Sequence, residues 1–229
     1  MAMTQVEKKW RTAMVKQMRS WLGLNVYDGS AQEIMDMWNS YTPHYNGYNA
    51  NYRIAWCSET VSACAVAVGC TKVVPVMYES GQQVKWFEER NQFHKDQNYW
   101  PSMGDIIYFD WCGLSVQHVG MVEKVNPLRK TITTIEGNVD GRVIRRTIHQ
   151  GDDIIYGYAV PDYNSLALPF KSAKAKKVVD KAKSWIGKGS EDGFNKSLIN
   201  YYNRKIDTSN KATYSDAWSA IMISVVADK

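Results

Sequence analysis

The hydrophobic pattern of this chain changes near residue 104, and that change limits the folds open to it. Before this point, apolar residues recur at helical spacing. After it, short runs rich in Val, Ile and Tyr are separated by Gly, Asn and Pro. Helices followed by strands are typical of an α+β domain, here with helices packed on an antiparallel β-meander. The expected strands are residues 104–110, 117–126, 130–136, 142–148 and 154–160.

Four helices are expected before the strands. Ser30 and Glu33 form a capping-box pattern, which predicts a helix that begins at Ser30. Gly69 is a stop signal for a very apolar helix that carries a cysteine at its front. The expected helices are residues 5–22, 30–40, 56–68 and 85–90.

The size and charge of the chain exclude little. Its 229 residues allow one to two domains, and a net charge of +5 favours an acidic partner without identifying it. No nucleic-acid recognition motif accompanies that charge, so we do not expect nucleic acid to be the partner. We find no apolar run of the length that spans a membrane, and no signal-peptide core in residues 1–24. We therefore expect a protein made in the cytoplasm and not inserted into a membrane.

The four cysteines are expected to be reduced thiols. Cys57 and Cys64 lie two turns apart on one predicted helix, too far apart for a disulfide without distortion. No cysteine pair has zinc-finger spacing. Buried cysteine is common, so we interpret Cys64, Cys70 and Cys112 as core packing.

Cys57 differs from the other cysteines in its position and in the residues that come after it. It stands at the front of the apolar helix, where the helix dipole favours a thiolate. His118 lies just inside a strand about sixty residues later and is a candidate base. Glu136 on the next strand could orient the His118 ring, and Asn138 should point to the same face as Glu136. The backbone N–H of Cys57 is the natural first oxyanion donor.

Aromatic residues are frequent, with nine Trp and fourteen Tyr. They suit a groove for sugars or peptides, and equally well a core with an aromatic rim. Three of them, Trp56, Tyr52 and Trp111, are predicted to contact substrate.

The end of the chain repeats its beginning in part. Ser184-Trp185-Ile186-Gly187 repeats Ser20-Trp21-Leu22-Gly23, and Ala217-Trp218-Ser219 matches Ala55-Trp56-Cys57. No histidine follows Ser219, so this serine has no base to activate it. We expect a domain over residues 1–160, a linker over 161–176, and a catalytically silent truncated repeat over 177–229. The repeat is interpreted as a small helical module that binds the wall or supports homo-oligomerisation, or as a remnant of a duplicated gene.

Four segments in order, residues 55–58, 104–111, 118–125 and 135–138, resemble the CHAP domain, a cysteine, histidine-dependent amidohydrolase/peptidase. The resemblance covers about residues 5–160. It implies a papain-like α+β fold and hydrolysis of an amide bond in bacterial peptidoglycan. It also implies Cys57 as nucleophile, His118 as base, Glu136 as the group that orients it, and Asn138 as a supporting polar residue. In this respect the chain resembles endolysins of phages and prophages that infect Gram-positive bacteria.

One departure from that pattern concerns metal. Relatives often have an Asp-rich loop before the histidine, whereas residues 110–117 contain a single acid. We therefore expect neither a metal ion nor a cofactor.

The predicted function is an endolysin-like peptidoglycan hydrolase that acts on the wall after release from the host cytoplasm, with teichoic acids as a second wall partner. Whether it is an N-acetylmuramoyl-L-alanine amidase or an endopeptidase stays open. Two alternatives also stay open: a non-catalytic wall-binding or virion structural protein that retains the fold, and a thiol amidase acting on a small amide.

Overall fold

The computed structural model describes residues 3–96, 98–166, 184–185, 199–200 and 203. The chain divides into two compact units, residues 1–168 and 169–229. In the second unit, Trp185 and Ile199 are described and both are buried. Ser219 and most of the predicted linker and repeat lie outside the described residues, so the predicted division at residues 160 and 176 stays a prediction.

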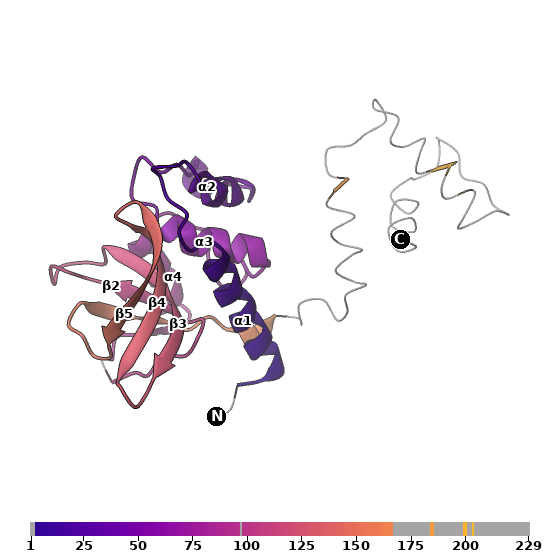
Figure 1. The fold of residues 1–229 in the computed structure, drawn as a ribbon. Helices are drawn as coiled ribbons and strands as arrows, with labels where there is room; N and C mark the ends of the chain where they lie inside the picture. Colours follow the sequence, from indigo (N-terminus) through magenta and orange to yellow (C-terminus); the bar gives the residue numbers. More distant parts are fainter. Residues whose placement is uncertain (1–2, 97, 167–183, 186–198, 201–202, 204–229) are drawn as a thin grey trace. The chain divides into compact units, whose positions relative to one another are not determined.

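The first unit is an α+β domain with an antiparallel sheet, as predicted, but the sheet has six strands because β1, at residues 93–94, was not among the five expected (Figure 1). Its spatial order is β1-β6-β2-β3-β4-β5. The strands are β1 (Phe93–His94), β2 (Ile106–Phe109), β3 (His118–Asn126), β4 (Thr131–Val139), β5 (Arg142–His149) and β6 (Ile155–Ala159).

The predicted meander is right for β2 to β5 and wrong for β6. After β5 the chain crosses to the other side of β2, where β6 pairs with β2 and then with β1. All four residues of β2 are buried, with Ile106 and Tyr108 in one apolar cluster and Ile107 and Phe109 in another. A strand buried on both faces is typically central, and β6 supplies its second neighbour.

Four α-helices precede or flank the start of the sheet. They are α1 (Gln5–Ser20), α2 (Gln32–Asn39), α3 (Cys57–Val68) and α4 (Ser80–Glu88). The described residues of the first unit also contain two short 3-10 helices, η1 (Tyr45–Gly47) and η2 (Tyr163–Ser165). Among the described residues, no helix combines the length and apolar character needed to cross a membrane.

The predicted capping box at Ser30 is wrong. Helix α2 has Ala31 as its N-cap, without a side-chain bond. The Ser30 hydroxyl instead accepts the backbone N–H of Asn25, and the Glu33 carboxylate accepts the indole N–H of Trp21. Both polar groups therefore tie α2 to the segment before it and not to its own first turn.

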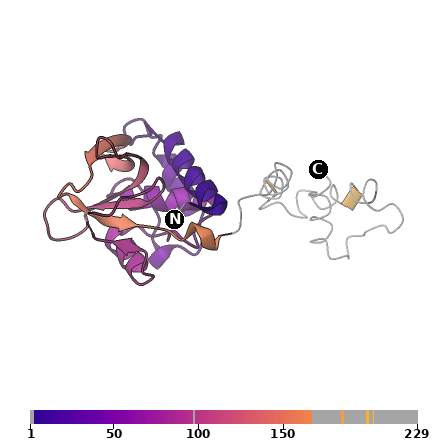
Figure 2. The same ribbon diagram turned by 90° about the horizontal axis from the view of Figure 1, so that it is seen from below.

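Helix α3 lies at the centre of the domain. It packs against α1, α2, β3 and β4, and its first nine residues are all buried (Figures 1 and 2). A helix covered on all sides is typically apolar all round, and from Ala63 onward α3 has that pattern, whereas its buried first half carries the polar residues Ser58, Glu59, Thr60 and Ser62. Gly69 ends α3 in the left-handed conformation with φ +85°, as predicted.

A buried ion pair fixes α1 to the start of β2. Arg11 and Asp105 are 2% and 0% exposed, and the Arg11 Nη1 donates to the Asp105 carboxylate. Gly104 makes this approach possible, because a Cβ at that position would lie 3.0 Å from the Arg11 Cβ. The Gly-Asp pair before β2 is thus a docking point for α1.

Candidate active site

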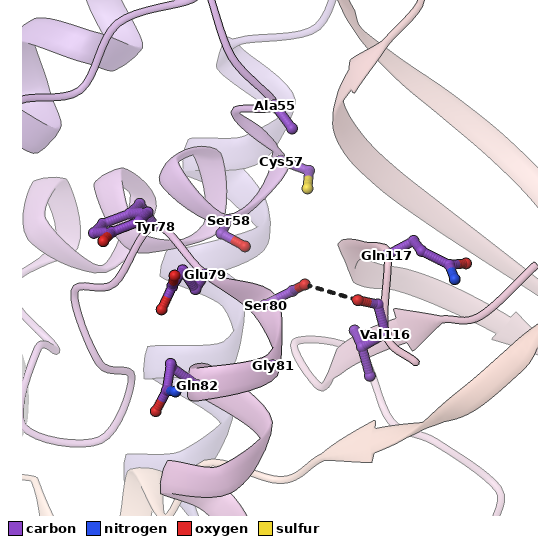
Figure 3. Close-up of a pocket in the computed structure, with 10 residues that line it drawn as sticks. All are labelled: Ala55, Cys57, Ser58, Tyr78, Glu79, Ser80, Gly81, Gln82, Val116 and Gln117. Carbon is purple, nitrogen blue, oxygen red and sulfur yellow. Dashed lines mark hydrogen bonds between the residues drawn. The ribbon is translucent and has the colours of Figure 1, made fainter. Parts of the chain in front are cut away.

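Cys57 is the first residue of α3, and its side chain is almost buried, with 5% exposed. The backbone N–H of Thr60 is bonded to the carbonyl of Trp56, so the first-turn bond starts one residue before Cys57. The backbone N–H of Cys57 therefore has no acceptor within the helix. The thiol lies at the positive end of the helix dipole, as predicted, and faces an open pocket (Figure 3).

His118 is the first residue of β3 and contacts both of its predicted partners. Its Nε2 lies 2.9 Å from Glu136 Oε2, and the Cys57 thiol is close enough to interact with the ring and raise its pKa. Burial of the ring lowers the pKa of His118, but the hydrogen bonds and charges of Cys57 and Glu136 raise it more, to about 9. With these partners the imidazole is protonated at neutral pH.

Glu136 lies in β4 and is fully buried. Its carboxylate accepts hydrogen bonds from His118, from the Thr134 hydroxyl and from Arg146, whose Nε and Nη2 lie 3.0 and 2.8 Å away. Burial alone would raise the pKa of Glu136, but these bonds and the Arg146 charge lower it below its usual value. Glu136 is therefore a carboxylate that faces the His118 ring.

Thr134 and Arg146 were missed by the sequence analysis. Thr134 lies two residues before Glu136 on β4, and Arg146 is paired with Thr134 across the β4–β5 ladder. Cross-strand partners of this kind lie on one face of the sheet. Arg146 could have been identified from the register of the β4–β5 hairpin, but the sequence alone determines this register only to within several residues.

Two glycines make room for this arrangement. A Cβ at Gly120 would lie 2.5 Å from the Cγ of Glu136. A Cβ at Gly137 would lie 2.0 Å from the Thr60 hydroxyl in the first turn of α3. The glycines after His118 and Glu136 thus allow the glutamate to reach the histidine and allow α3 to approach the sheet.

Asn138 was predicted to point to the same face as Glu136 because side chains alternate along a strand. That alternation is interrupted between the two residues. Asn138 has φ +59° and lies where the β4–β5 register shifts, between Glu136 and Val139. Within the described part of the chain, no hydrogen bond joins Asn138 to Cys57, His118 or Glu136. Its supporting role stays a prediction.

The three predicted substrate contacts lie in different surroundings. Trp111 is 51% exposed, and its ring centroid lies 5.2 Å from that of His118. Tyr52 is exposed but lines another pocket, with Gln32, Asn51 and Arg53. Trp56 is a core residue with 1% exposed, so a substrate contact would require its side chain to be uncovered.

All four cysteines are free thiols. Cys64 and Cys70 are buried beside Met14, as the core interpretation predicted, and burial raises the pKa of both thiols. The same interpretation of Cys112 is wrong, because this residue is exposed in the loop before His118.

The single acid of that loop has a local role. The Asp110 carboxylate accepts the backbone N–H groups of Cys112, Gly113 and Leu114. Among the described residues, no group of three or more His, Cys, Asp or Glu side chains is arranged to hold a metal ion.

The pocket that Cys57 faces has a volume of about 370 Å³ (Figure 3). It lies between the first turn of α3, the start of α4 and the end of the loop before β3. Its lining residues are Ala55, Cys57, Ser58, Tyr78, Glu79, Ser80, Gly81, Gln82, Val116 and Gln117.

Comparison with known proteins gives one family. No curated protein matches this chain. Among solved structures, the crystal structure of Ly7917 matches with a TM-score of 0.33 and 13% identity, over 66% of this chain and 62% of that chain. The match thus spans less than two thirds of that structure. The family model of the CHAP domain matches residues 44–138, a range that includes Cys57, His118 and Glu136. CHAP domains are usually cysteine- and histidine-dependent amidohydrolases or peptidases, so the match suggests an activity of that class on peptidoglycan. Residues 44–138 thus match the CHAP domain model, the family that the sequence motifs resemble.

Proposed function

We propose that this protein is an endolysin-like peptidoglycan hydrolase that cleaves an amide bond through a thiol acyl-enzyme. The observation that carries the proposal is the contact series Cys57–His118–Glu136 at the edge of an open pocket. A nucleophile bonded to a base, and a base bonded to a third group, is the arrangement that covalent amide hydrolysis requires. A cysteine helix set against a histidine on an antiparallel sheet also supports a papain-like fold.

In the proposed reaction, the Cys57 thiolate attacks the carbonyl carbon of the scissile amide. The oxyanion accepts the free backbone N–H of Cys57. His118 donates its proton to the leaving amine, the C–N bond breaks, and a thioester with Cys57 remains. Water then attacks the thioester with neutral His118 as base, which releases the acid product and the thiol. Glu136 keeps the ring oriented and stabilises its positive charge throughout.

The bond cleaved stays open between the muramoyl–L-alanine amide and a peptide bond of the stem or cross-bridge, because both need the same groups. Release from the host cytoplasm before action on the wall is part of the proposal. So is a wall-binding or oligomerising role for residues 177–229, with teichoic acids as the second wall partner.

A turbidity assay on purified Gram-positive cell walls tests the proposal. We expect the wild type to clear the walls and Cys57→Ala to lose this activity. Cys112→Ser, a change at an exposed thiol outside the contact series, should retain the activity. Mass spectrometry of the fragments then identifies the bond from the new termini. Intact walls with the wild type, or clearing by Cys57→Ala equal to it, would refute the proposal.

A further inference from the structure

The pocket beside Cys57 contains a hydroxyl that the proposed reaction does not use. Ser58 is 1% exposed, and its Oγ has no hydrogen-bond partner among the described residues. The side chain nevertheless lines the pocket, between Cys57 and the start of α4 (Figure 3). Buried hydroxyls nearly always have a partner, so an unpartnered one that faces a pocket indicates a site for a ligand acceptor.

The wall of the pocket formed by the start of α4 supplies further hydrogen-bond donors. Helix α4 has nine residues, and its N-cap, Glu79, makes no side-chain capping bond. The first N–H bonded to the N-cap carbonyl is that of Gln83, at 3.1 Å. The backbone N–H groups of Ser80, Gly81 and Gln82 therefore have no helical acceptor, and these three residues line the pocket. The Ser80 hydroxyl is already bonded to the Val116 carbonyl, at 3.5 Å (Figure 3).

The charges around these donors disfavour an anion. The exposed carboxylate of Glu79 lines the pocket, and the lining contains no Lys, Arg or His. The positive end of α4 is equivalent to about half an elementary charge, which is less than the full negative charge of Glu79. A neutral acceptor gains the hydrogen bonds without this repulsion, whereas a carboxylate does not.

We propose that this pocket binds the neutral carbonyl of an amide next to the scissile bond, and that it thereby selects a stem peptide with a carboxamide over one with a free carboxylate. Ser58 and the N-terminus of α4 provide the hydrogen bonds, and Glu79 excludes the anion. The identification of the ligand as a peptidoglycan stem peptide rests on the proposed function.

Binding to the full-length Cys57→Ala variant tests this without turnover. The probes are N-acetyl-L-alanyl-D-isoglutamine and N-acetyl-L-alanyl-D-glutamate. They differ only in the α-group, which is a carboxamide in the first and a carboxylate in the second, and each is titrated at neutral pH by NMR. We expect the amide to bind about 3- to 10-fold more tightly. Adding Ser58→Ala should weaken amide binding about 3- to 10-fold, the value of one neutral hydrogen bond.

Glu79→Gln in the same background should raise the affinity for the acid by a similar factor. Glu89→Gln, which removes an exposed carboxylate just beyond the other end of α4, is the charge-matched control and should change neither affinity. Equal affinities for the two probes, no saturable binding of either, or no effect of Ser58→Ala would overturn the inference. Wall clearing by the wild type is measured separately, so failure of the pocket and failure of the proposed function remain distinguishable.

Discussion

At the scale of the residue, the proton on His118 depends on two neighbours. Burial lowers the pKa of His118, whereas Cys57 and Glu136 raise it to about 9. A protonated ring is needed to release the leaving amine, so kcat/KM should fall as the pH rises through about 9. Glu136→Gln removes the charge that stabilises the imidazolium. This variant should shift the alkaline limb to lower pH and reduce kcat/KM on the order of 100-fold.

The measurement is kcat/KM against pH for wild type and Glu136→Gln on a solubilised wall substrate. Glu33→Gln, in α2 and outside the contact series, is the matched control and should keep the wild-type limb. An alkaline limb that stays in place in Glu136→Gln would show that Glu136 does not set the protonation of His118.

Some residues of the site could be predicted from the sequence and others could not. Cys57, His118 and Glu136 come together in the structure because each belongs to a motif whose element could be predicted, one helix start and two neighbouring strands. Arg146 was not predicted because its contact with Glu136 depends on strand register. Trp56 shows the other difficulty, since a residue beside a nucleophile can lie in the core, and only the packing around it decides its exposure.

At the scale of the element, the long strands and three of the helices were predicted within a few residues. Their order in the sheet was not, because β6 pairs with β2 through a contact between segments about fifty residues apart. Local pattern predicts a strand, but not which edge it joins. Helix α4 begins at Ser80, earlier than predicted, because its first turn is polar and lacks the apolar periodicity that marks the rest.

The docking of α1 on β2 leads to a prediction about stability. Asp105→Asn would leave Arg11 buried with only the partly exposed Glu7 as a charged partner, whose carboxylate lies 2.8 Å from the Arg11 Nε. Breaking a buried ion pair in this way should lower the free energy of unfolding by about 3 kcal/mol. Urea unfolding followed by tryptophan fluorescence measures this change. Asp153→Asn, at an exposed position, should stay within about 0.5 kcal/mol of wild type, and an equally small effect of Asp105→Asn would contradict the account.

At the scale of the whole molecule, the two units are expected to contribute differently to catalysis and to wall binding. Residues 1–168 contain the complete contact series of Cys57, His118 and Glu136. Residues 169–229 carry the sequence repeat, in which Ser219 replaces the cysteine. A serine hydroxyl is a weaker nucleophile than a thiolate, so chemistry should depend on the first unit alone.

Deletion of residues 169–229 should therefore leave kcat/KM on a soluble peptide fragment within about twofold of the full chain. If the second unit binds the wall, the same deletion should reduce binding to purified walls by about 10- to 100-fold, since losing one of two linked binding modules removes the gain from effective concentration. Ser219→Ala in the full chain is the matched control and should change neither value. Pelleting with wall sacculi and light scattering measure binding and assembly side by side. Loss of peptide cleavage by a deleted chain that still folds would place part of the catalytic machinery in the second unit, while unchanged wall binding and unchanged assembly would leave that unit with neither proposed role.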